Sequence, residues 1–134
     1  MARDLEQEAR NKALVIEAFD TLFNRRDFAA AERYWPPDYI QHSAGIGPGR
    51  EGLFTLVRTV HRKYESALAV AEGDYVMIHG RMSGGGRPTR IVVDIFRVER
   101  GQLVEHWDVL QDEVTRADSK SGLPMFGNTF PEPP

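Results

Sequence analysis

Cysteine is absent from the 134-residue chain, which excludes disulfides, thiolate metal ligands and a cysteine nucleophile. No apolar run approaches the roughly 18 residues that cross a bilayer, and the first residues lack the apolar stretch of a signal peptide. The net charge is −3 and the basic residues form no stripe or block, which argues against nucleic acid as a partner. We therefore expect a cytoplasmic protein that binds neither nucleic acid nor membrane.

The remaining composition is typical of one globular domain that spans residues 1–134. Hydrophobic residues at 41% and charged residues at 28% are ordinary for such a domain, and the length suffices for one core. The chain contains no internal repeat and no linker. Residues 113–134 mix polar residues with glycine and proline, so we expect a mostly irregular tail there.

Helical spacing of apolar residues dominates the first half of the chain. Asp4 can cap a first helix that runs to about Asn24. Asp27 can cap a short second helix, residues 28–35, which two following prolines stop. A third helix is predicted over residues 50–66.

The second half of the chain alternates like β-strands. Extended segments are predicted at residues 38–42, 67–71, 75–82, 91–98 and 102–110. Helices followed by an antiparallel meander are typical of an α+β domain. A sheet with apolar residues on both faces needs a covering layer on each face. Helices can cover one face, and the other, which carries Val93, Ile95, Trp107 and Val109, is expected to form a homodimer interface.

Three ionisable side chains share one face of the last two predicted strands. Alternation places Asp94 on that face of one strand and His106 and Asp108 on that face of the next. Two carboxylates and an imidazole among apolar neighbours are costly to bury without a purpose. This pattern favours a small-molecule site, although Asp94 could instead pair with an arginine and His106 could be a hydrogen-bonded core histidine.

Two segments resemble the SnoaL-like polyketide cyclases of the nuclear transport factor 2-like superfamily, which includes ketosteroid isomerase. These are Asp38-Tyr-Ile-Gln-His42 and the run from Val93 to Asp108, within a likeness that covers about residues 8–112. The resemblance implies a cone-shaped α+β barrel. Three N-terminal helices would pack on a strongly curved, mostly antiparallel sheet, with an apolar pocket at the wide end.

The resemblance also implies roles for individual residues. In the SnoaL-like cyclases an aspartate on the final strand is the general acid/base of an aldol closure, and Asp108 occupies that position. Asp94 matches the protonated aspartate that donates to the oxyanion in ketosteroid isomerase. That enzyme's general base follows the second helix, where this chain has His42, and its first-helix tyrosine is replaced by Phe19.

Proton abstraction next to a carbonyl requires a base and a donor for the enolate oxygen. Desolvation and a nearby like charge both raise the pKa of a carboxyl group. Asp94 and Asp108 are therefore expected to share one proton, an arrangement borrowed from ketosteroid isomerase, while His42 or His106 shuttles protons. Neither a cofactor nor a metal is expected, since the histidines lack metal-ligand spacing. The expected core or substrate-binding residues are Phe19, Trp35, Tyr39, Phe54, Phe96 and Leu110.

These features predict a cofactor-independent enzyme that cyclises or isomerises a small hydrophobic or polyketide-like carbonyl compound. The alternative is a non-catalytic, dimeric binding module for a hydrophobic ligand. Epoxide hydrolysis by an Asp-Arg-Asp set ranks last, because no arginine is predicted on the face that carries Asp94 and Asp108, since Arg97 points opposite to Asp94.

Overall fold

Five strands form one mixed sheet in the computed structural model, which describes residues 2–131. The strands are β1 (Ile40–Gln41), β2 (Lys63–Glu72), β3 (Tyr75–Ser83), β4 (Arg90–Glu99) and β5 (Gln102–Asp112). Their order in the sheet is β1-β5-β4-β3-β2. The short β1 pairs in parallel with β5, and all other pairs are antiparallel. The predicted α+β class is confirmed.

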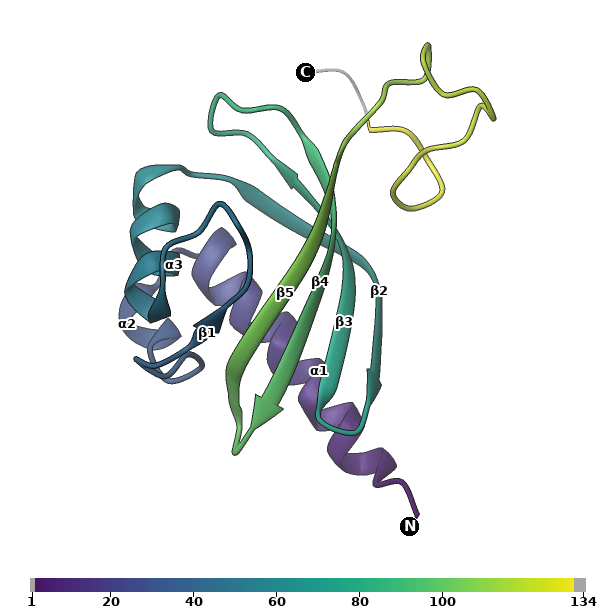
Figure 1. The fold of residues 1–134 in the computed structure, drawn as a ribbon. Helices are drawn as coiled ribbons and strands as arrows, with labels where there is room; N and C mark the ends of the chain where they lie inside the picture. Colours follow the sequence, from purple (N-terminus) through teal and green to yellow (C-terminus); the bar gives the residue numbers. More distant parts are fainter. Residues whose placement is uncertain (1, 132–134) are drawn as a thin grey trace.

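Helices lie along one side of this curved sheet (Figure 1). They are α1 (Leu5–Phe19), the π-helical turn η1 (Asp20–Asn24), α2 (Phe28–Ala31) and α3 (Gly49–Thr59). Asp4 and Asp27 cap α1 and α2 as predicted, each accepting a backbone N–H three residues on. None of the helices in the described part of the chain is long and apolar enough to span a bilayer.

Two helix boundaries differ from the prediction. The second helix ends at Ala31. The third ends at Thr59, and the chain enters β2 at Lys63 after Val60 adopts an extended conformation. Asn24 stabilises this change from helix to strand. Its side chain accepts a hydrogen bond from the backbone N–H of Tyr64 and donates one to the backbone carbonyl of Tyr64, both at 3.0 Å. Apolar spacing had placed Tyr64 on a helix, but tertiary contacts hold it on a strand.

The core lies between the helices and the inner face of the sheet. Phe96 of β4 contacts Phe19 of α1, with ring centroids 5.1 Å apart in a T-shaped arrangement. Trp35 and Phe54 pack edge to face at 6.0 Å and are fully buried. Aromatic pairs in these geometries add to the stabilisation from burial, so they stabilise the packing of the helices against the inner face of the sheet.

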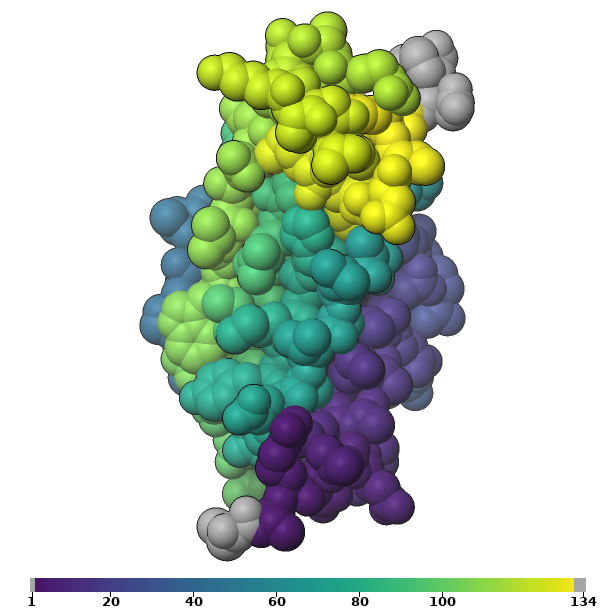
Figure 2. All heavy atoms as spheres, turned by 90° about the vertical axis from the view of Figure 1, so that its right-hand side faces the viewer, coloured from purple at the N-terminus to yellow at the C-terminus, as the bar shows by residue number. Residues whose placement is uncertain are grey.

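The outer face of the sheet is covered only in part. Residues beyond β5 fold back over its upper end, where the tail lies against β3 (Figure 2). Phe126 contacts the ring of His79 at 5.7 Å, and Glu113 forms an ion pair with Arg81 at 2.7 Å. The tail has no helix or strand between residues 113 and 131, as predicted for that range. Large apolar side chains stay exposed on this face: Leu68, Val70, Tyr75, Met77, Val93 and Val109.

Candidate functional site

A buried ionisable pair lies at the centre of the sheet's inner face. Asp94 of β4 lies opposite Asp108 of β5, and Phe96 lies opposite His106, so all four side chains point to the same face. This confirms the shared face predicted from alternation. Asp94 and His106 are each only 4% exposed. Asp94 pairs with His106 rather than with an arginine, at 2.7 Å between Oδ1 and Nε2.

The second oxygen of Asp94 is held by Tyr64 of β2. The Tyr64 hydroxyl donates to Asp94 Oδ2 at 2.8 Å. Burial and the nearby Asp94 raise the pKa of Tyr64 well above its ordinary value of 10.0, so the phenol stays protonated and remains a donor. The intervening β3 has glycine at position 80, where a Cβ would clash with the Tyr64 hydroxyl. Because Gly80 has no side chain, the Tyr64 side chain can extend across β3 and reach Asp94 on β4.

Hydrogen bonds also fix the protonation of His106. Gln41 Oε1 accepts the backbone N–H of Ser43 at 2.9 Å and lies 2.6 Å from His106 Nδ1, which therefore carries a proton and donates it. The hydrogen bond between His106 Nε2 and Asp94 Oδ1 requires a second proton, which either of these two atoms can carry. The pair is consequently neutral overall. Tyr39 and Phe96 flank the imidazole with centroids 6.5 Å and 4.7 Å away.

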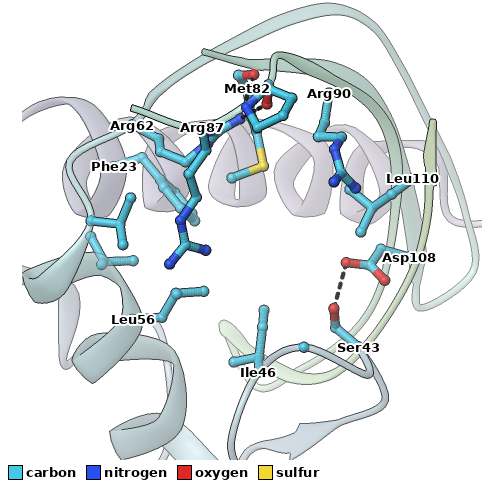
Figure 3. Close-up of a pocket in the computed structure, with 14 residues that line it drawn as sticks. Phe23, Ser43, Ile46, Leu56, Arg62, Met82, Arg87, Arg90, Asp108 and Leu110 are labelled. Carbon is cyan, nitrogen blue, oxygen red and sulfur yellow. Dashed lines mark hydrogen bonds between the residues drawn. The ribbon is translucent and has the colours of Figure 1, made fainter. Parts of the chain in front are cut away.

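Asp108 lies at the edge of this pair and faces a cavity of about 270 Å³ (Figure 3). The Ser43 hydroxyl donates to Asp108 Oδ2 at 2.7 Å. Asp108 makes no ion pair within the described residues and is the one carboxylate in the cavity wall. Most of the wall is apolar, and its larger apolar members are Phe23, Ile46, Leu56, Val57, Val60, Met82 and Leu110.

The predicted substrate-binding residues divide between the core and this cavity. Leu110 lines the cavity. The other five are buried in the core and do not line it: Phe19, Trp35, Tyr39, Phe54 and Phe96. They therefore lie in the core, one of the two places expected for them. Packing between the helices and the sheet leaves them at most 6% exposed.

Three arginines share the cavity with Asp108, namely Arg62, Arg87 and Arg90. Arg90 shares the face of Asp94, because it precedes Asp94 by four residues on β4, so the prediction that no arginine lies on this face was wrong. Arg90 pairs with Asp112 at 2.6 Å and makes no ion pair with Asp94 or Asp108 in the described structure. An Asp-Arg-Asp set for epoxide hydrolysis is therefore not assembled.

His42 lies on the opposite side of the sheet from the buried pair. Its ring stacks on Trp107 at 4.8 Å with an interplanar angle of 4°, and its Nε2 lies 2.8 Å from Glu105 Oε2. Trp107 and Glu105 alternate with His106 along β5 and point outward. The predicted place of His42 beside the carboxylates is thus corrected. Alternation through β1 turns Gln41 inward and His42 outward.

The outward cluster at Glu105 leads to a prediction about acid stability. Hydrogen bonds from His42 and then from Arg97 lower the pKa of Glu105 below its ordinary value of 4.5. A lowered folded-state pKa stabilises the fold above the unfolded-state value, and this contribution is lost as pH falls through the folded-state value. Glu105→Gln is expected to lose less stability than wild type below pH 4.5, measured by urea denaturation across pH. An exposed carboxylate without an ion pair in the described chain, Glu32, provides the control Glu32→Gln. Parallel curves for Glu105→Gln and wild type would contradict the prediction.

Asp94, His106 and Asp108 could also hold a metal ion, since one ligand atom from each lies within 4.8 Å of the others. The prediction against a metal relied on spacing along the chain and overlooked donors brought together across paired strands. Both ring nitrogens of His106 and both oxygens of Asp94 are already hydrogen-bonded. A cation would have to displace these bonds.

Comparison with known proteins places the fold and the family. The family model described as the SnoaL-like domain matches residues 15–106, about two-thirds of the chain. The chain belongs to the SnoaL-like domain family. The predicted resemblance is thereby confirmed, although the match ends at His106 and so does not include Asp108. Among curated proteins, none matches this SnoaL-like chain.

Solved structures of the same fold extend the comparison. TsrD from Streptomyces laurentii is 25% identical with a TM-score of 0.65, over 77% of this chain and 89% of its own. An LEH-like epoxide hydrolase from M. tuberculosis is 20% identical with a TM-score of 0.65, over 78% and 85% of the two chains. A Bacillus cereus protein provisionally named a polyketide cyclase is 16% identical with a TM-score of 0.67, over 81% and 78%. These neighbours share the fold, and the second and third carry different activities in their names.

Several site residues were missed by sequence reasoning. Gln41 and Ser43 flank His42, and alternation alone could have directed them inward. Tyr64 carried no local signal, because its phenol reaches Asp94 across β3. Arg87 lies in the loop between β3 and β4, where periodicity does not apply.

Proposed function

We propose that this SnoaL-like protein catalyses proton transfer on a small carbonyl compound, as an aldol-type cyclisation or an isomerisation that needs no cofactor. The environment of Asp108 carries the proposal. Its carboxylate faces a largely apolar cavity and receives one hydrogen bond from residues 2–131, which Ser43 donates to Oδ2. The other oxygen, Oδ1, is available to accept a proton from a substrate, which is the geometric requirement for a general base.

Asp108 alone can serve as both the base and the acid in these reactions. Asp108 removes a proton from the carbon next to a carbonyl and leaves an enolate, whose charge is favoured by the arginines of the same cavity. In an aldol closure the enolate carbon attacks a second carbonyl, and protonated Asp108 returns the proton to the resulting alkoxide. In an isomerisation the proton returns to a different carbon. Both routes regenerate the carboxylate.

Asp94 and His106 act in this scheme as positioning residues. They do not line the cavity. Because the pair is neutral overall, Asp108 is the one net negative charge of the cluster. Hydrogen bonds with Gln41 and Tyr64 hold the pair in place beside Asp108.

Deuterium incorporation tests the proposed reaction class without a known product. Wild-type protein is incubated in D₂O with a panel of aryl ketones and β-diketones, and uptake at the carbon next to the carbonyl is followed by mass spectrometry. We expect enzyme-dependent exchange for at least one compound. Binding by thermal shift across the panel with no exchange above the buffer rate would instead support a non-catalytic binding module.

We further propose that the exposed apolar part of the sheet's outer face binds a second copy of the chain. Leu68 and Val109 are 67% and 66% exposed, and Val93 lies directly between the His79 and Val109 positions in the ladder. Contiguous exposed apolar surface of this kind is typical of subunit interfaces. Val109→Glu is expected to convert a dimer to a monomer in sedimentation equilibrium. Ile16→Glu, on the exposed side of α1, is the matched control and should leave the mass unchanged. A monomeric wild-type protein would refute the proposal.

A further inference from the structure

The cavity wall carries an excess of positive charge. Three guanidinium groups, from Arg62, Arg87 and Arg90, share the wall with a single carboxylate, that of Asp108. They come from the segment before β2, the loop between β3 and β4, and the first residue of β4. Figure 3 shows Arg62 and Arg87 next to each other and Arg90 beside Leu110, all on the part of the wall away from Ser43 and Ile46. An apolar cavity with this charge pattern is suited to an anion.

Arg62 contributes a buried charge that the described protein does not neutralise. It is 7% exposed, and its guanidinium donates to the backbone carbonyls of Met82, Gly84 and Pro88 at 2.8–2.9 Å. It makes no ion pair with a carboxylate in the described chain. Burial, and then the positive charge of Arg87, lowers the pKa of Arg62. Arg62 and Arg87 both line the cavity, so a bound anion would relieve the repulsion between their charges.

Arg87 is the group free to bind such an anion. Residues 2–131 offer it no hydrogen bond or ion pair, and Figure 3 shows its guanidinium projecting into the cavity. Arg90, by contrast, is already paired with Asp112. A guanidinium presents a fork of N–H donors that matches the two oxygens of a carboxylate and binds it in a bidentate manner.

We infer that the substrate carries a permanent carboxylate in addition to its reacting carbonyl group, and that Arg87 binds this carboxylate while Arg62 and Arg90 add favourable charge. This inference rests on the proposed proton-transfer function and names its substrate class. The apolar body of the keto acid would contact Phe23, Leu56 and Leu110, and the reacting carbon would lie beside Asp108. A cavity of about 270 Å³ is near the lower limit of roughly 300 Å³ for ligand pockets, which suits a compound of one or two rings.

The test compares 4-acetylbenzoate with its neutral analogue 4-acetylbenzamide, each titrated into the full chain by calorimetry at low salt. We expect wild type to bind the carboxylate about tenfold to hundredfold more tightly than the amide, as charge-assisted hydrogen bonds allow. Arg87→Gln should lose this preference. Arg100→Gln removes the same charge at an exposed turn and should keep it.

Two outcomes would overturn the inference: equal affinity of wild type for both compounds, or an unchanged preference in Arg87→Gln. The Asp108→Asn variant separates this test from that of the proposed function. It should retain the preference for the carboxylate, because it removes a negative charge from the cavity. If exchange depends on Asp108 but wild type binds both compounds equally, the proposed function stands and the inference of a substrate carboxylate is rejected.

Discussion

Asp108→Asn is expected to lower the rate of deuterium exchange into a bound ketone by about 10²- to 10⁴-fold, the usual contribution of a general base. The amide cannot accept the proton, but its oxygen can still accept the hydrogen bond that Ser43 donates to Asp108. Folding and ligand binding should therefore survive. Exchange is measured by mass spectrometry at saturating ketone, and binding is measured by calorimetry on the same samples.

The matched control for this variant is Asp118→Asn, which removes an exposed carboxylate from the tail and should exchange at the wild-type rate. Ser43→Ala should lie between the two variants, since the base remains but loses the donor that orients it. An Asp108→Asn protein that exchanges as fast as wild type would reject Asp108 as the base, whatever its effect on binding.

Asp94→Ala is expected to lower the free energy of unfolding by about 3–5 kcal/mol, the usual cost of removing one member of a buried ion pair. The substitution leaves His106 and the Tyr64 hydroxyl without their partner in a place where water cannot replace it. Urea denaturation at neutral pH, followed by circular dichroism, measures the loss.

Asp94→Asn separates the hydrogen bonds from the charge. Its amide oxygen can accept from Tyr64, and its amide nitrogen can donate to the Nε2 of a neutral His106, so most of the stability should return. Equal losses for the alanine and asparagine variants would show that the charge of Asp94, rather than its hydrogen-bonding shape, stabilises the fold.

The paired strands were the most predictable part of this protein. Alternation along β4 and along β5 predicts which side chains of each strand share a face, and His106 and Asp108 were found together for this reason. Asp94 lies opposite Asp108 because a bulge next to the turn, between Arg97 and Val98, shifts the register by one residue. The family resemblance also came from this region, where local pattern and tertiary structure agree.

The rest of the site depends on contacts that local pattern does not encode. Tyr64 has helical spacing with Val57 and Val60, but the Asn24 side chain and pairing with β3 hold it on β2. Its contact with Asp94 then requires a glycine on the strand between them. Arg87 lies in a loop whose path is set by Arg62, 25 positions earlier in the chain. Such long-range contacts become visible only in three dimensions.

Arg62 holds the loop between β3 and β4 through backbone carbonyls alone. Any amino acid supplies a carbonyl, so the side chain at a position such as Arg87 can be exchanged while the anchor stays intact, whereas Gly84, Gly85 and Gly86 have positive φ angles that favour glycine. A lineage can therefore alter which compound the cavity accepts by point substitutions at positions such as Arg87, without rebuilding the sheet or moving Asp108. Because Arg62 lies outside the loop and holds it by its backbone, positions such as Arg87 can change during evolution while the loop keeps its path.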